Sequence, residues 1–200
     1  GVHAYGQVAN FKTKKCLDTE QLAKELNQYL PQDIRITKAE EVDERFHARL
    51  SAVEKEYVYR IWNSTVPNVF ERKYLYRLSE SLDVVAMQKA AESFLGEHDF
   101  KSFCGNKRMK KSTVRRIYDI VFEETEEKLV LHFYGNGFLY QMVRILTGTL
   151  IEVGEGKRKA SEMEDILQAG KREVAGFTAP SRGLFLREVY YEDWKGGDEV

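Results

Sequence analysis

Apolar residues recur along the chain with two periods, one typical of strands and one typical of helices. Val2, Ala4, Gly6 and Val8 alternate with larger or polar residues, which predicts a β-strand at the first residues. A strand that begins at the first residue leaves a neighbouring edge without its partner. We therefore expect the chain to be a fragment of a longer protein.

Further extended segments follow from alternation and from β-branched and aromatic content, which is densest at Tyr57–Trp62. They are predicted at residues 34–36, 46–52, 57–62, 73–78, 114–123, 129–134 and 184–191, with an acidic turn at 125–127 that forms a hairpin. The helical period predicts helices at residues 19–30, about 87–95, 138–153 and about 161–167.

From residue 57 onward the order is β, β, α, β, β, α, α, β, which predicts an α+β fold. We expect two ferredoxin-like or RRM-like halves that share a largely antiparallel sheet, with helices on one face. Residues 1–52 are the remainder of an incomplete amino-terminal half, residues 53–194 form the carboxy-terminal half, and residues 195–200 form a flexible tail. No Pro-, Gly- or Ser-rich linker separates the halves, which favours one continuous sheet.

Composition excludes several classes of protein. A chain of 200 residues with 42% hydrophobic and 32% charged residues is typical of a globular domain rather than a disordered one. No apolar run approaches 18 residues, so no membrane partner is expected. Two cysteines cannot form a disulfide framework or a four-cysteine zinc site, which favours a reducing, cytoplasmic setting. No metal-ligand spacing or nucleotide-binding glycine pattern is present, and we expect neither a metal nor a cofactor.

Charge is segregated although the net charge is only −1. The stretch from residue 107 to residue 116 contains no acidic residue and six basic ones: Lys107, Arg108, Lys110, Lys111, Arg115 and Arg116. Such a run is either an ordinary solvated loop or a surface that contacts the phosphates of a nucleic acid. Its density and its freedom from acidic residues favour phosphate contact.

Arg144 lies in the predicted helix at 138–153, which is apolar nearly all round and should be buried on more than one side. A buried arginine requires an anionic partner, because an unpaired buried charge is costly. The partner can belong to a structural ion pair or to a functional site. Tyr57 lies in the strand predicted at residues 57–62, and the simplest interpretation is that its ring belongs to the core.

Four linked motifs give the sequence a resemblance to the TruA family of tRNA pseudouridine synthases. Residues 1–8, Gly-Val-His-Ala-Tyr-Gly-Gln-Val, are similar to the end of the family's R-T-D-x-G-V-H-A motif. The second motif matches residues 46–52 with Lys55-Glu56-Tyr57-Val58-Tyr59. The third matches residues 137–144 with Gly148, and the last matches Ala179-Pro180 with residues 183–186.

This resemblance implies isomerisation of uridine to pseudouridine in the anticodon stem-loop of tRNA by a cytoplasmic homodimer, without metal or cofactor. It also implies that Tyr57 stacks on the target base, that Arg49 binds substrate, and that Arg144 pairs with a nucleophilic aspartate. That aspartate would lie two positions before Gly1. We therefore expect this chain to lack the nucleophile and to be inactive alone.

The main alternative is a non-catalytic RNA-binding module on a ferredoxin-like fold. Such a module should carry an RNP-type run of exposed sheet aromatics, and the sequence contains none. A purely structural domain would leave both the basic run and Arg144 unexplained.

Overall fold

The computed structural model describes residues 1–106 and 108–192. It forms two compact units. The sheet unit, as we call it, comprises Gly1–Gln7 and Val53–Tyr190, and the smaller unit comprises Val8–Ala52 with the residues from Tyr191 on.

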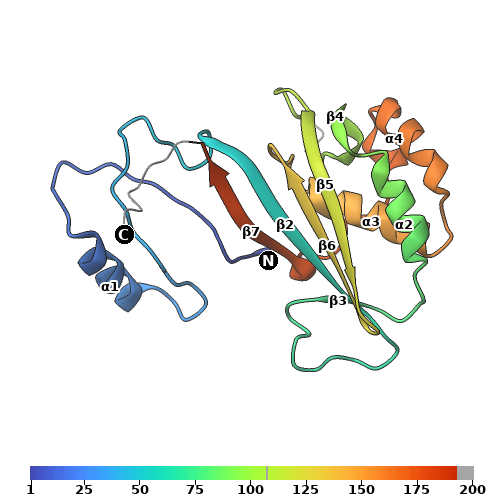
Figure 1. Ribbon diagram of the computed structural model, residues 1–200, viewed down its shortest axis with the longest axis horizontal. Coiled ribbons are helices and arrows are strands. Elements are labelled where there is room, and N and C mark those ends of the chain that lie inside the picture. Colours follow the sequence, from blue (N-terminus) through green and yellow to red (C-terminus); the bar gives the residue numbers. More distant parts are fainter. Residues whose placement is uncertain (107, 193–200) are drawn as a thin grey trace. The chain divides into compact units, whose positions relative to one another are not determined.

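The sheet unit is built on one seven-stranded sheet with the strand order β1-β7-β2-β6-β5-β4, and β3 pairs separately with β2 (Figure 1). The pairings β2–β6, β5–β6 and β4–β5 are antiparallel, whereas β1–β7 and β2–β3 are parallel. This confirms the predicted α+β fold with a largely antiparallel sheet. The strands are β1 His3–Ala4, β2 Ala52–Asn63, β3 Tyr76–Leu78, β4 Gly96–Asp99, β5 Val114–Glu124, β6 Lys128–Gly135 and β7 Leu184–Tyr191.

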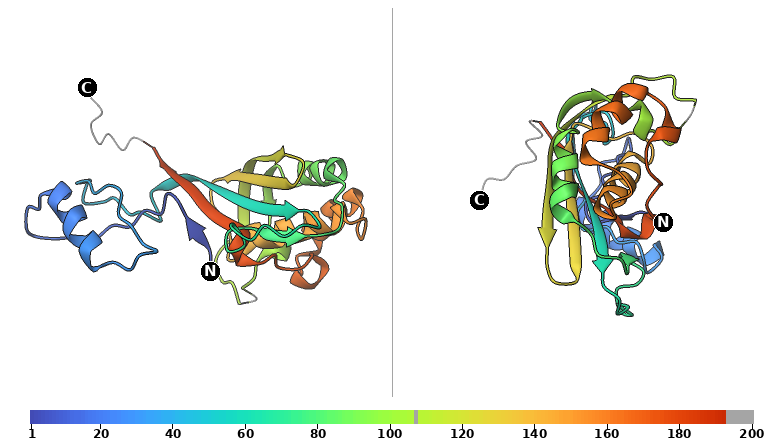
Figure 2. Two further views of the ribbon diagram at one scale, coloured as in Figure 1. Left: turned by 90° about the horizontal axis from the view of Figure 1, so that it is seen from below. Right: turned by 90° about the vertical axis from the view of Figure 1, so that its right-hand side faces the viewer.

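The helices of the sheet unit cover one face of this sheet (Figure 2). They are α2 Val84–Glu92, α3 Met142–Gly154 and α4 Met163–Ala169, with short 3-10 turns at Lys101–Phe103, Ala160–Glu162, Arg172–Val174 and Ser181–Gly183. Between helices and sheet lies one core, in which Tyr59 and Ile61 of β2, Phe133 of β6, Met87 of α2 and Leu146 of α3 are all fully buried. Alternate residues of β2 thus face the helices, as the two-residue period requires.

Several predicted element boundaries in the sheet unit need correction, and for two of the differences the backbone gives the reason. Strand β4 was not predicted. A glycine after a helical pattern indicates the end of a helix, but Gly96, with φ of +90°, is here also the first residue of a short strand. Helix α3 begins at Met142 rather than at Phe138, since Gln141 takes a left-handed conformation that a continuous helix excludes.

The smaller unit contains helix α1, Thr19–Tyr29, whose first turn is capped by the Asp18 carboxylate. The strand predicted at residues 34–36 does not form. Instead, the Asn27 side chain accepts a hydrogen bond from the Ile36 N–H at 2.8 Å and donates one to the Ile36 carbonyl at 2.9 Å. This side chain therefore takes the bonds that a neighbouring strand would make.

The helix-free face of the sheet carries a buried carboxylate. The Glu56 side chain, only 9% exposed, accepts hydrogen bonds from His132 Nδ1 at 2.9 Å and from the Tyr134 hydroxyl at 3.2 Å. Burial and the Glu56 carboxylate raise the pKa of Tyr134 to about 12, so this hydroxyl remains a donor at neutral pH. His132 Nε2 lies 3.5 Å from a carboxylate oxygen of Glu123.

His132→Ala is expected to lower the free energy of unfolding by about 3 kcal/mol, because it leaves the Glu56 carboxylate buried with one donor fewer. For a chain of this size that corresponds to a fall in Tm of about 6–12 °C. Glu56→Gln keeps the shape and should cost about 1 kcal/mol. In the double variant, His132→Ala should cost clearly less than it does alone. Additive costs in thermal melts would show that the two side chains are not coupled.

Candidate active site

The start of α3 is the most unusual backbone of the sheet unit. Gln141, which precedes the helix, has φ of 62° and ψ of 6°, and among the described residues it alone combines a positive φ with a side chain. This left-handed conformation costs a non-glycine residue roughly 1–2 kcal/mol. Its carbonyl accepts the Ile145 N–H at 3.0 Å, so the turn at Gln141 fixes where the helix begins.

Arg144 lies in the first turn of α3 and is clamped to the segment that precedes β7. Its Nε donates to the Ala179 carbonyl at 2.6 Å, and the Ala179 N–H donates to the Arg144 carbonyl at 3.0 Å. The side chain is half-buried rather than fully buried, which corrects the prediction from the apolar helix. Within the described residues, no carboxylate forms an ion pair with it. The clamp therefore orients the guanidinium and leaves its Nη edge available to an anion.

Tyr59 lies near this arginine on the helix-facing side of β2, and Tyr57 lies on the same side of the strand. The Tyr59 hydroxyl donates to the Pro180 carbonyl at 2.7 Å, next to the carbonyl that Arg144 binds. Burial raises the pKa of Tyr59, and the positive charge of Arg144 opposes this rise. Tyr57 is half-buried, its ring centre lies 5.2 Å from that of Phe138 in an edge-to-face arrangement, and burial raises its pKa too.

The segment that holds Arg144 is itself fixed along α3 by close backbone packing. A Cβ added to Gly148 would lie 1.9 Å from the Phe177 carbonyl oxygen, so only glycine permits this approach. The Thr149 hydroxyl accepts the Gly176 N–H at 2.9 Å, and the Glu152 carboxylate accepts the Phe177 N–H at 3.1 Å. These contacts set the position of the Ala179 carbonyl.

The first residues of the chain reach the same region. Strand β1 pairs with β7 through His3 and Phe185, and a Cβ on Gly1 would lie 2.6 Å from the Ser181 hydroxyl. Ser181 directly follows the Ala179–Pro180 pair that binds Arg144 and Tyr59. Gly1 therefore lies against Ser181, two residues after the Ala179 carbonyl that binds Arg144.

The predicted basic residues do not all share one surface. Arg108, Lys110 and Lys111 are exposed on the basic loop, by which we mean residues 106–113, while Lys107 lies outside the described residues. Arg115 and Arg116 are neighbours on β5 and therefore point to opposite faces. Arg115 is half-buried, bonds the Ser112 and Val114 carbonyls, and lies near Gly137, just before Phe138. The basic loop and Arg115 thus belong to the helix-side surface, and Arg116 does not.

Arg49 belongs to the smaller unit, where it is exposed and its N–H donates to His47 Nδ1 at 3.1 Å. Its role as a substrate-binding residue stays a prediction. The carboxy-terminal tail predicted at residues 195–200 lies outside the described residues.

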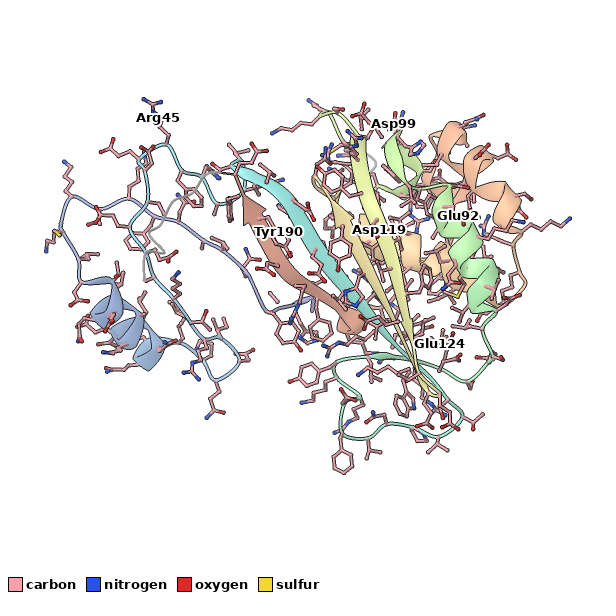
Figure 3. The ribbon with its side chains drawn as sticks, viewed as in Figure 1. Arg45, Glu92, Asp99, Asp119, Glu124 and Tyr190 are labelled. Atoms are coloured by element: carbon pink, nitrogen blue, oxygen red, sulfur yellow. The ribbon has the colours of Figure 1, made fainter. Side chains whose placement is uncertain are left out.

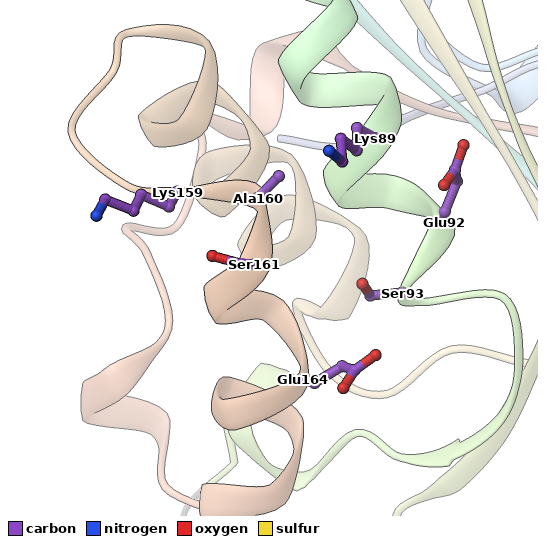
Figure 4. Close-up of a pocket in the computed structure, with 7 residues that line it drawn as sticks. All are labelled: Lys89, Glu92, Ser93, Lys159, Ala160, Ser161 and Glu164. Carbon is purple, nitrogen blue, oxygen red and sulfur yellow. The ribbon is translucent and has the colours of Figure 1, made fainter.

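An open depression of about 510 Å³ between α2 and α4 is unrelated to these residues (Figure 4). It is polar, and two lysines balance two glutamates in its lining of Lys89, Glu92, Ser93, Lys159, Ala160, Ser161 and Glu164. Across residues 1–106 and 108–192, no group of three or more His, Cys, Asp or Glu side chains is placed to hold a metal ion. In the same part of the chain, no helix is long and apolar enough to cross a membrane.

The structure thus places Tyr57 on the helix-facing side of β2 against Phe138, and Arg144 six residues after Phe138 in the first turn of α3. It adds Tyr59, Phe138 and the Ala179–Pro180 carbonyls, which were not assigned a role. The signal for Tyr59 was its position two residues after Tyr57, because residues at that spacing share a face. This arrangement can hold a flat ring against Tyr57 and can pair an anion with the Arg144 guanidinium.

Comparison with known proteins gives consistent matches. A family described as tRNA pseudouridine synthase matches residues 90–192. The chain is 48% identical to the tRNA pseudouridine synthase A of Bacillus pumilus over 193 residues, which cover 96% of this chain and 78% of that protein. Identity to the proteins of the same name is 46% in Bacillus subtilis and 47% in Acetivibrio thermocellus, each with the same coverage of both chains.

Proposed function

This chain belongs to the tRNA pseudouridine synthase family, and we propose that it supplies the base-holding and arginine-bearing part of an enzyme that isomerises uridine to pseudouridine in the anticodon stem-loop of tRNA. The observation that carries the proposal is the clamped guanidinium of Arg144. Its Nε is fixed by the Ala179 carbonyl, and no described carboxylate pairs with it. Tyr59 binds the next carbonyl of the same segment, and Tyr57 lies on the same face of β2 as Tyr59.

The proposed roles follow from the demands of the reaction. A uridine must leave the helical stack before its base can be detached, turned and rejoined through carbon. The ring of Tyr57 holds the flipped base by stacking, as aromatic side chains do in RNA-binding proteins. Phe138 supports Tyr57 from the edge and keeps its ring in one orientation.

The nucleophile in this proposal is an aspartate two positions before Gly1 in the encoded protein. Support comes from Gly1 itself, which lies against Ser181, two residues after the Ala179 carbonyl that binds Arg144. There the Nη edge of Arg144 would keep the carboxylate ionised and oriented for attack. The 200-residue chain alone would bind RNA and not modify it.

The basic loop and Arg115 would bind tRNA phosphates on the same side of the molecule, since three of their side chains are exposed cations. We also propose that Arg49 contacts the substrate and that the enzyme acts as a cytoplasmic homodimer.

The proposal is tested with the protein that carries its encoded upstream residues, on a tRNA transcript in single turnover. Tyr57→Leu is expected to slow pseudouridine formation roughly 5- to 150-fold, the range that corresponds to loss of one base–aromatic stack. Tyr57→Phe keeps the ring and should stay within about threefold of the unmodified enzyme.

Tyr190→Leu is the matched control, because Tyr190 is an exposed tyrosine of β7 outside the site (Figure 3). It should leave the rate unchanged. If the extended protein binds tRNA but forms no pseudouridine, the non-catalytic RNA-binding alternative replaces this proposal. Pseudouridine formation by the 200-residue chain would disprove the assignment of the nucleophile.

A further inference from the structure

Gln141 keeps a side chain at a backbone position that suits glycine best. Its φ of 62° is one that L side chains rarely adopt, and no side chain caps the helix at this point. Residues are held in such conformations only where the surroundings fix them, and these positions cluster at functional sites. In this conformation the Gln141 side chain points toward Gly105.

That side chain lies directly against Gly105, the last residue before the basic loop. A Cβ on Gly105 would lie 2.3 Å from Gln141 Oε1 and 3.0 Å from its Cδ. The Gly105 N–H also donates to the Tyr140 carbonyl at 2.8 Å. One end of the basic loop is therefore seated on the residues that begin α3.

The other end of the basic loop is anchored independently. The Thr113 hydroxyl donates to Asp99 at the end of β4 at 2.5 Å, and the Phe100 N–H donates to the Thr113 carbonyl at 3.1 Å (Figure 3). With this end fixed to the sheet, the Gly105–Gln141 contact determines where the loop stands relative to Arg144, three residues after Gln141.

We propose that Gln141 is a positioning residue for the reaction. Its side chain sets the separation between the basic loop, which binds tRNA phosphates, and Arg144, which pairs with the nucleophilic aspartate. The inference rests on the proposed function, which assigns tRNA phosphates to the basic loop and the nucleophilic aspartate to Arg144. Small errors in such a separation slow a reaction while the same charges still bind the substrate.

The decisive variant is Gln141→Gly, since glycine accepts the left-handed backbone and removes the side chain. We expect an unchanged or higher Tm, a Kd for tRNA within about twofold, and a single-turnover rate lower by roughly 10- to 100-fold. Gln141→Asn is the conservative variant, because asparagine also tolerates this conformation. It should recover at least part of the rate.

Gly105→Ala alters the Gly105–Gln141 contact by adding a Cβ to Gly105 that would clash with the Gln141 side chain. It should also slow the reaction, and adding it to Gln141→Gly should slow the reaction no further, because the clashing side chain is then gone. A full rate for Gln141→Gly would overturn the inference. So would a change in Kd with an unchanged rate, which would make Gln141 a simple RNA contact. Absence of pseudouridine formation in the unmodified enzyme would instead refute the proposed function.

Discussion

Arg144→Lys is expected to lower single-turnover pseudouridine formation by about 10²–10³-fold while the protein folds nearly normally. The guanidinium serves two partners from two edges, the Ala179 carbonyl through Nε and the proposed aspartate through Nη. A lysine ammonium is a single point of charge and cannot hold both at once. Loss of the hydrogen bond to Ala179 should cost only about 1 kcal/mol of stability.

Arg172→Lys is the matched control for this prediction. Arg172 bonds the same segment, donating to the Ala175 carbonyl at 3.3 Å and to the Thr178 hydroxyl at 2.9 Å. Its hydrogen bonds go to residues other than Ala179, so its replacement should change Tm similarly and leave the rate intact. Full turnover in Arg144→Lys with an unchanged melt would end the catalytic interpretation of Arg144. Equal losses of rate in both variants would indicate a purely structural role.

The second large effect is expected from Gly148→Ala, which should lower the free energy of unfolding by about 3 kcal/mol or more. Its Cβ would lie 1.9 Å from the Phe177 carbonyl oxygen and 2.9 Å from the carbonyl carbon. Neither backbone atom can move without displacing the segment from residue 175 to residue 180. The better helix propensity of alanine, about 1 kcal/mol, offsets only part of this cost.

A thermal melt should show a fall in Tm of about 6–12 °C for Gly148→Ala. Gly137→Ala serves as the stability control, because the nearest neighbour of its Cβ is an Arg115 side-chain atom at 3.7 Å, an ordinary contact. If Gly148→Ala melts like Gly137→Ala, the close approach of α3 to Phe177 is not a constraint in solution.

Gly148→Ala and Arg144→Lys, both in α3, together distinguish effects on the free energy of unfolding from effects on the rate of reaction. Gly148→Ala displaces the Ala179 carbonyl and should therefore reduce both stability and rate. Arg144→Lys should reduce the rate strongly and stability by only about 1 kcal/mol. If Gly148→Ala and Arg144→Lys change Tm and rate in the same proportion, residues 175–180 do not act as the support of Arg144.

Local pattern was enough to predict the elements whose periods are regular. The hairpin of β5 and β6 follows from alternation and an acidic turn, and helix α1 follows from the helical period. Prediction was wrong where one side chain or one backbone angle replaced the regular bonds. Asn27 takes the backbone bonds of Ile36, and Gln141 delays the start of α3.

By itself the sequence determined the α+β class and the largely antiparallel sheet, because periodicity and residue type act over neighbouring residues. The roles of Tyr57 and Arg144, which the family resemblance implies, stay predictions. Only the tertiary structure decided that Arg144 is half-buried and held by a carbonyl 35 residues away. It alone placed Gln141 against Gly105. These features depend on which distant backbone segments come into contact, and such long-range packing leaves no period in the chain.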